Sequence, residues 1–295
     1  MKKYDTLGDK IFLAVIYIIL IFLFIIMLYP FWETVVLSVS PREDAIKLGA
    51  HVWTSKPTIN AYKQVFAIKE FWNAMKNSVV RVVLGTFLTV FFTALTAYPL
   101  SKENLPGKKI VMNYFIFTML FGGGMIPTYL VIKGLHLTNT IWALVVPGCV
   151  GAYNLIIMRN FLSAIPKDMG ESALIDGAGE FTIWLRIILP LSKPVLATIA
   201  LWSALGHWNA YLDALIYITD QKKYVLSIIL RRVLITNEAS MFLMGDSAAD
   251  AGAQLQTEET VKSTMIMFSI LPIAVIYPFL QKYFTKGMMV GSVKG

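Results

Sequence analysis

The sequence is poor in the residues that catalytic, metal and disulfide sites require. It has one cysteine and three histidines in 295 residues, and the histidines match no H-E-x-x-H or similar spacing. A single cysteine cannot supply a disulfide framework or a cysteine-based metal site. The chain also has no G-x-x-x-x-G-K-[ST] motif, and therefore no P-loop to hold ATP phosphates. We therefore expect neither an enzyme nor a metal or cofactor on this chain.

Charge is scarce as well. Charged residues make up 15% of the chain and hydrophobic residues 57%, with a mean hydropathy of +0.64, whereas soluble domains are about 25% charged and 45–50% apolar. The run Ile11–Phe31 has no charge, and about 20 helical residues cross a bilayer. It exceeds the roughly 7–15 apolar residues of a cleaved signal peptide, and no A-x-A-like site follows. These features predict a membrane anchor that is not removed.

Five further apolar stretches follow the first. The six predicted spans cover about 11–31, 78–100, 110–132, 137–158, 195–219 and 263–280. They predict an all-α membrane protein with one transmembrane domain over residues 1–295. The third stretch contains "FGGGMIP", which indicates either a loosened helix lining a cavity or a close contact between helices.

The basic residues indicate the orientation of the spans. If there are six, four short hydrophilic segments share one side; their basic residues are Lys2, Lys3, Lys10, Lys102, Lys108, Lys109, Arg159, Lys167, Arg186, Lys193, Lys282, Lys286 and Lys294. The connection near Lys133–Leu137, on the other side, has one lysine. The positive-inside rule then places both termini in the cytoplasm and the long loops 40–77 and 220–262 outside. The net charge of +8 is scattered among these loops, so it indicates topology rather than nucleic-acid binding.

The fifth span, "LWSALGHWNAYLDALIYIT", is the most polar. Polar groups within a spanning helix are functional candidates, and aromatic walls with a few hydrogen-bonding groups suit a small ligand such as a sugar. The candidate substrate path comprises Tyr129, Asn154, Trp202, His207, Trp208, Asn209, Tyr211 and Asp213. The alternative is that Asp213 and the tryptophans lie at the outer interface, where tryptophan is common.

A charged segment interrupts the apolar chain between the fourth and fifth spans. It reads "ESALIDGAGEFTIWLRIILP", from Glu171 to Pro190, within a predicted cytoplasmic loop at 165–190. Ala173, Asp176, Gly177 and Glu180 recur at spacings of three and four, which predicts one helical face. The periodicity alone leaves open whether this is a solvated connector or a helix that docks on a partner.

The same segment resembles the loop signature of permease subunits of bacterial ABC importers. That signature reads E-A-A, three residues, G, nine residues, I-x-L-P. Here Glu171, Ala173, Gly177, Ile187, Leu189 and Pro190 match it at the full spacing, and Ser172, in place of the first alanine, is the only departure. "DGAGEFTIWLRIILP" and the tail "FTKGMMVGSVKG" resemble the carbohydrate branch of the family. "GGGMIPTYLVIKGLHLTNTIWALVVPG" is similar to a subgroup associated with uptake of oligosaccharides or of products of polysaccharide breakdown.

The resemblance implies a type I ABC importer permease fold, with the loop forming a coupling helix in a groove of a separate ATPase subunit. It implies a second permease, two ATPase subunits that bind ATP and Mg, an extracellular binding protein, an oligosaccharide substrate and a bacterial cell membrane. The coupling residues would be Glu171, Ser172, Ala173, Asp176, Gly177 and Phe181. The small side chains allow a close approach, Glu171 suits a charge-assisted hydrogen bond, Gly177 permits a bend and Phe181 offers an apolar anchor.

Two other functions fit a polar fifth span and a charged loop. A self-sufficient secondary transporter would use His207 and Asp213 as a proton relay, although the six spans show no obvious inverted repeat. A membrane scaffold would use the loop only to dock a cytoplasmic partner.

Overall fold

The computed structural model describes residues 7–166, 168–235 and 257–292, with side chains as far as Tyr277. Lys2, Lys3, Lys167, Lys294, residues 236–256 of the predicted outer loop and the side chains of the tail motif lie outside the described residues. The chain divides into two compact units. Unit 1 comprises Met1–Lys69 and Leu230–Ile270, and unit 2 comprises Glu70–Ile229 and Leu271–Gly295.

Unit 1 contains the first predicted span as one long helix. Its elements are α1 (Leu7–Ser38), α2 (Arg42–Ala45), α3 (Asn60–Ala67), the end of α14 (Leu226–Ile235) and the first part of α16 (Glu258–Ser292). Most apolar side chains of α1 are exposed, as expected of a helix whose solvent is lipid. Near its end, the Ser38 hydroxyl accepts a hydrogen bond from Tyr62 at 2.9 Å. Tyr62 and Phe66 of α3 both meet the ring of Phe268 of α16 edge-on.

The connection between α1 and α3 is organised around one buried carboxylate. Asp44 accepts hydrogen bonds from the Thr54 hydroxyl at 2.9 Å and from the backbone and hydroxyl of Ser55 at 2.8 and 2.6 Å. Lys47 adds an ion pair. Lys47 first, and then Ser55 and Thr54, hold the pKa of Asp44 well below its usual range. This connection therefore folds back on itself through polar contacts.

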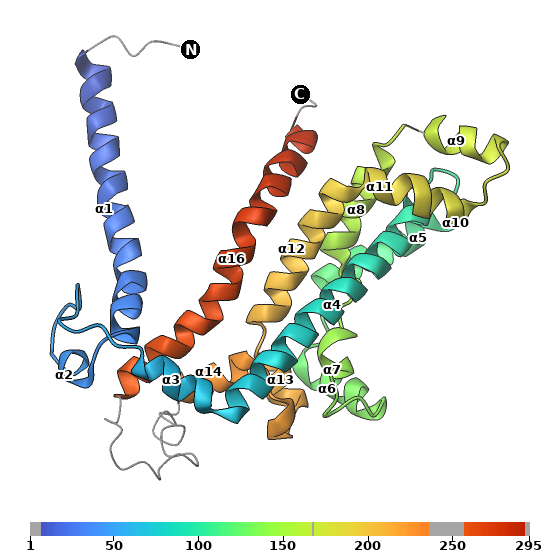
Figure 1. Cartoon of the computed structure of the whole chain (residues 1–295). Coiled ribbons are helices and arrows are strands. Elements are labelled where there is room, and N and C mark those ends of the chain that lie inside the picture. Colours follow the sequence, from blue (N-terminus) through green and yellow to red (C-terminus); the bar gives the residue numbers. More distant parts are fainter. Residues whose placement is uncertain (1–6, 167, 236–256, 293–295) are drawn as a thin grey trace. The chain divides into compact units, whose positions relative to one another are not determined.

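Unit 2 is a group of helices that includes α4, α8 and α12, labelled in Figure 1. Its elements are α4 (Lys69–Ser101), α5 (Lys108–Leu120), α6 (Met125–Gly134), α7 (Trp142–Val145), α8 (Ala152–Ser163), α9 (Asp168–Ile175), α10 (Glu180–Ile183), the π-helical η1 (Trp184–Ile188), α11 (Leu189–Leu191), α12 (Lys193–Asn209), α13 (Leu212–Tyr217) and the 3-10 helix η2 (Gln221–Lys223). Its core joins α4, α8, α10, η1 and α12 through Ala94, Ala97, Leu100, Leu155, Met158, Leu162, Ile183, Trp184, Ile188, Val195 and Ile199. Small residues on α4 allow this close packing.

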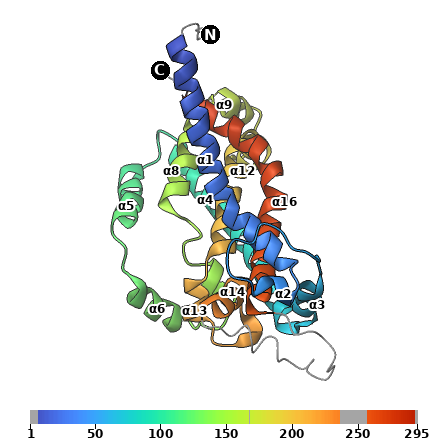
Figure 2. The ribbon, with the colours of Figure 1, turned by 90° about the vertical axis from the view of Figure 1, so that its left-hand side faces the viewer.

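Three of the described helices are long and apolar enough to cross a membrane: Leu7–Ser38, Lys69–Ser101 and Glu258–Tyr277. Counting each bent pair as one span raises this number to five. One such pair is α5 and α6, which meet at 118° and which Figure 2 shows as separate rods joined by an extended stretch. Gly124 in that break has a φ of +84°, and a Cβ there would meet no atom within 4 Å. The break therefore agrees with a loosened helix, and among the described residues no close contact requires this glycine.

Two further predicted spans are also divided. Residues 137–158 do not form one helix, because the chain unwinds between α7 and α8 at Pro147, which lacks an N–H, and at Gly148, with a φ of +76°. The predicted span 195–219 is likewise divided, because α12 ends at Asn209 and α13 begins at Leu212. Within the described residues, all regular structure is helical, and three to five apolar spans replace the six continuous ones that were predicted.

Candidate coupling loop and transport path

The predicted coupling loop contains two helical parts joined at a glycine. Helix α9 ends at Ile175, and Gly177 follows with a φ of +82°. The N–H of Ala178 donates to the carbonyl of Ala173 at 2.9 Å, and that of Gly177 donates to Leu174 at 3.0 Å. This pair of bonds is the Schellman helix end, which favours glycine at its left-handed position. The expected bend at Gly177 is present, but the single helical face predicted through Glu180 is wrong, because the helix stops before it.

The six predicted coupling residues do not all face solvent. Glu171, Ser172, Asp176, Gly177 and Phe181 are exposed, whereas Ala173 is half-buried against the chain's own core. The Ser172 hydroxyl donates to the carbonyl of Asp168 at 2.8 Å, one turn earlier in the same helix. Among the described residues, nothing bonds the Glu171 carboxylate. Helix α9 therefore presents a surface that combines a carboxylate with apolar side chains, since Leu174 and Ile175 are 46% and 87% exposed.

The second half of the loop is anchored. Ile183 and Trp184 are each 2% exposed, and the Trp184 ring lies edge-on to Phe91 of α4 at 6.1 Å. The rings of Phe181 and Trp184 also pack together, with their centres 5.4 Å apart. The segment that ends in the I-x-L-P motif is therefore part of the core, which explains its apolar residues.

Glu180 connects the loop to the end of α4, a role that the sequence prediction missed. Its carboxylate accepts a hydrogen bond from the Tyr98 hydroxyl at 2.7 Å and forms an ion pair with Lys102. The Lys102 ammonium also lies 4.9 Å from the centre of the Tyr98 ring. Hydrogen bonds from Lys102 and then Tyr98 lower the pKa of Glu180, so the carboxylate is ionised at neutral pH. We call these three residues the loop clasp.

The predicted path residues lie in separate places. Tyr129 of α6 stacks on Tyr217 of α13 at 6.3 Å, and Trp202 of α12 packs on Tyr153 of α8 at 5.6 Å. The others are distributed over α8 (Asn154), the end of α12 (His207, Trp208 and Asn209) and the start of α13 (Tyr211 and Asp213). The structure brings His207 and Asp213 together around one residue of α4.

That residue is Arg81, which is 1% exposed. Its guanidinium forms an ion pair with Asp213 and donates to the carbonyl of Ala210 at 3.0 Å. The His207 ring lies against Gly85, one turn further along α4, where an added Cβ would come within 2.6 Å of ring carbons. Asp213 therefore neutralises a buried cation, a pairing that the sequence analysis did not predict. A lone arginine in an apolar helix signals that a partner is needed.

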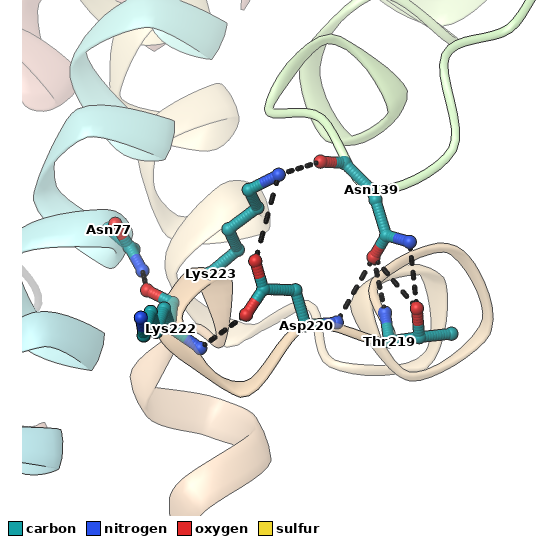
Figure 3. A network of polar contacts seen from close by, with 6 residues as sticks. All are labelled: Asn77, Asn139, Thr219, Asp220, Lys222 and Lys223. Atoms are coloured by element: carbon teal, nitrogen blue, oxygen red, sulfur yellow. Dashed lines mark hydrogen bonds and ion pairs between the residues drawn. The ribbon is translucent and has the colours of Figure 1, made fainter.

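The break between α6 and α7 is tied to the segment after α13 by Asn139, as Figure 3 shows. The side-chain oxygen of Asn139 accepts from the backbone N–H groups of Thr219 and Asp220 at 2.6 and 3.1 Å. Its carbonyl accepts from Lys223 at 2.8 Å, and Asn77 of α4 holds the next turn through the carbonyl of Lys222 at 3.0 Å. A pocket of 380 Å³ lies beside this network, lined by Asn77, Asn139, Thr140, Ile141, Trp142, Leu144, Ile218 and Lys223. None of the eight predicted path residues lines it.

Replacing Asn139 with alanine is expected to destabilise this end of unit 2 by about 2–4 kcal/mol. The variant loses several hydrogen bonds of about 0.5–1.5 kcal/mol each, and alanine is strained at the φ of +59° that Asn139 adopts. Thermal unfolding in detergent measures the loss. Asn209→Ala is the matched control, because Asn209 is exposed and no described hydrogen bond involves its side chain. Equal melting temperatures for the two variants would contradict this role for Asn139.

Comparison with known proteins identifies the family. Residues 7–290 match the family described as "Binding-protein-dependent transport system inner membrane component". The chain belongs to this family. It is therefore a component of a membrane transport system, as the loop signature predicted, and a multi-pass protein of the inner membrane.

Relatives of this permease cover nearly its whole length. It is 42% identical to Protein LplC of Bacillus subtilis over 270 residues, covering 92% of this chain and 90% of that protein. It is 36% identical to the polygalacturonan/rhamnogalacturonan transport system permease protein YtcP of Bacillus subtilis, covering 98% and 100%. A crystal structure of a bacterial ABC transporter involved in the import of the acidic polysaccharide alginate contains a similar chain. That chain is 28% identical, with a TM-score of 0.88 and coverage of 96% of this permease and 100% of that chain.

Proposed function

We propose that this chain is a transmembrane permease subunit of an ATP-driven ABC importer for an oligosaccharide. One observation carries this proposal: the loop with the family signature presents an exposed helix, α9, on an anchored base, α10–η1. The similarity to a polygalacturonan/rhamnogalacturonan transport permease and to a chain of an alginate importer supports a sugar substrate. The family membership favours this function over the proton-coupled secondary transporter and the scaffold.

We further propose that the chain forms one six-span domain with both termini in the cytoplasm. In this topology the divided stretches 110–132, 137–158 and 195–219 each cross the membrane, since unwound backbone is tolerated where it lines a protein interior or cavity. The 79° bend between Glu180–Leu191 and Lys193–Asn209 supports a boundary between the loop and the fifth span. Loop 165–190 then lies at the cytoplasmic end of unit 2, and α13 lies at the opposite end.

The proposed partners follow from the architecture of ABC importers. A second permease would complete the pathway, an extracellular binding protein would deliver the sugar, and two ATPase subunits would bind ATP and Mg. Helix α9, with Glu171, Ser172, Asp176, Gly177 and Phe181, would contact an ATPase subunit. Ala173 is better suited to holding α9 on the permease, because it packs against the chain's own core. The sugar is proposed to contact two aromatic pairs, in which Tyr129 stacks on Tyr217 and Trp202 packs on Tyr153. Further proposed contacts are Asn154, Trp208, Asn209 and Tyr211.

Charge reversal at Glu171 tests this function. In proteoliposomes that contain the complete importer, Glu171→Lys is expected to reduce ATP-driven uptake of a labelled oligosaccharide at least about 10-fold, because a charge-assisted hydrogen bond contributes roughly 1.5–3 kcal/mol. The matched control is Glu43→Lys, which reverses an exposed carboxylate of α2, on the proposed outer side. Unchanged uptake in Glu171→Lys would refute the coupling assignment. Uptake by the chain alone under a proton gradient would support the secondary transporter instead.

A further inference from the structure

The two halves of the coupling loop differ in how firmly they are held. Helix α9 exposes most of its side chains, and the Schellman bonds at Gly177 close its last turn shortly before α10 begins. Helix α10 and η1 bury Ile183, Trp184 and Ile188 against α4 and α8. A force applied to α9 therefore reaches the spans through the packing of Ala173 on the core and, along the chain, through the start of α10 at Glu180.

The loop clasp lies at this point. Tyr98 lies in the last turn of α4 and Lys102 directly follows the helix, and both engage Glu180. Apolar contacts between α10 and α4 resist separation but allow small sliding movements, because they are not directional. Hydrogen bonds constrain distance and angle, so the clasp fixes the position of α10 along α4.

We propose that Glu180 is a positioning residue that transmits the movement of α9 to α4 through Tyr98 and Lys102. This inference rests on the proposed function, since it requires α9 to be the segment that an ATPase subunit moves. Because of the clasp, α4 is the span that moves together with the start of α10. Without the clasp, the ATPases still bind and hydrolyse ATP, but part of the movement of α9 is lost as sliding of α10.

The loop clasp contributes little to the stability of the fold, so its role in transmitting movement can be tested without unfolding the chain. The side chains of Lys102 and Glu180 are 41% and 54% exposed, and exposed ion pairs contribute little to stability because solvent screens them. The buried apolar residues of α10 and η1 remain in place when the clasp is removed. A variant that lacks the clasp is therefore expected to fold and assemble, and its defect should appear in coupling.

The test compares Glu180→Lys, Lys102→Glu and the double exchange in proteoliposomes that contain the complete importer. The readouts are labelled oligosaccharide imported per ATP hydrolysed, and assembly with the ATPase subunits. Each single reversal is expected to lower the import-to-hydrolysis ratio roughly 2- to 30-fold, the range seen for changes at coupling positions. The double exchange is expected to restore most of the ratio, because it re-forms the ion pair in the opposite sense. Tyr98→Phe, which loses only the hydroxyl, is expected to give a smaller decrease.

Lys109→Glu is the matched control, because it makes the same charge change at an exposed lysine at the start of α5. Glu180→Gln keeps an acceptor for the Tyr98 hydroxyl and remains informative if Glu180→Lys does not fold. An unchanged ratio in Glu180→Lys and Glu180→Gln, or no recovery in a folded double exchange, would overturn the inference. Loss of assembly with the ATPases would also overturn it, by assigning Glu180 to docking. The proposed function fails separately, if the wild-type importer takes up no oligosaccharide or if Glu171→Lys transports normally.

Discussion

Replacing Gly177 with valine is expected to abolish oligosaccharide import while leaving the chain in the membrane. The φ of +82° at Gly177 costs an ordinary L-residue about 1–2 kcal/mol, and a β-branched residue is a genuine outlier there. A Cβ at this position would meet no atom within 4 Å, so the strain comes from the backbone alone. The valine variant should lose the Schellman bonds and misdirect α9.

Uptake in proteoliposomes and hydrogen exchange of the α9 amides measure this effect. Gly179→Val is the matched control, two residues away, because Gly179 has an extended backbone with a φ of −73° and also has free space around it. It should retain most uptake. Gly177→Asn is expected to fall between the two, since asparagine tolerates the left-handed conformation. Normal uptake in Gly177→Val would show that the direction of α9 does not matter for import.

Removing the carboxylate of Asp213 is expected to lower the free energy of unfolding by about 3–5 kcal/mol, the typical loss when one partner of a buried ion pair is removed. In Asp213→Ala the Arg81 guanidinium stays buried and keeps only its bond to the carbonyl of Ala210. Thermal or denaturant unfolding in detergent measures the change. The effect is expected to be similar with and without sugar, because it arises from a contact within the chain.

Two comparisons isolate the cause. Asp220→Ala removes a half-exposed carboxylate that lies 3.8 Å from the Lys223 nitrogen and accepts the Lys222 N–H at 3.0 Å. It should cost about 1–2 kcal/mol, chiefly from the lost helix cap. The double variant Arg81→Met with Asp213→Leu should recover much of the stability, since apolar residues of similar volume can replace a buried pair. If Asp213→Ala is no less stable than Asp220→Ala, the ion pair does not stabilise the fold.

The sequence predicted those features of the fold that depend on residues close together in the chain, such as a long apolar helix and a bend at a glycine. The uncharged run beginning at Ile11 forms the long helix α1, and the bend at Gly177 follows from a backbone conformation that favours glycine. The predicted helix over 137–158 is divided because Pro147 and Gly148 unwind it. Hydropathy alone did not reveal this break, since all the residues around it are apolar.

The contacts missed by the sequence analysis join residues that are far apart in the chain. Arg81 in an otherwise apolar helix is a signal that a partner is needed, but that signal does not identify Asp213, which lies 132 residues away. Glu180 was assigned to a helical face, yet its partners are at the end of α4, 78 and 82 residues earlier. No periodicity within a single helix can identify such pairs, because they depend on which helices pack together.

The hydroxyl of Ser172 bears on the proposed contact between α9 and an ATPase subunit. It bonds to its own helix, at the carbonyl of Asp168, so the one residue that departs from the loop signature does not require a new donor or acceptor on the partner. An ATPase groove shaped for alanine at this position would need to accommodate only one additional oxygen atom. Under the proposed function, Ser172 therefore does not alter the contact that the loop signature makes with an ATPase subunit.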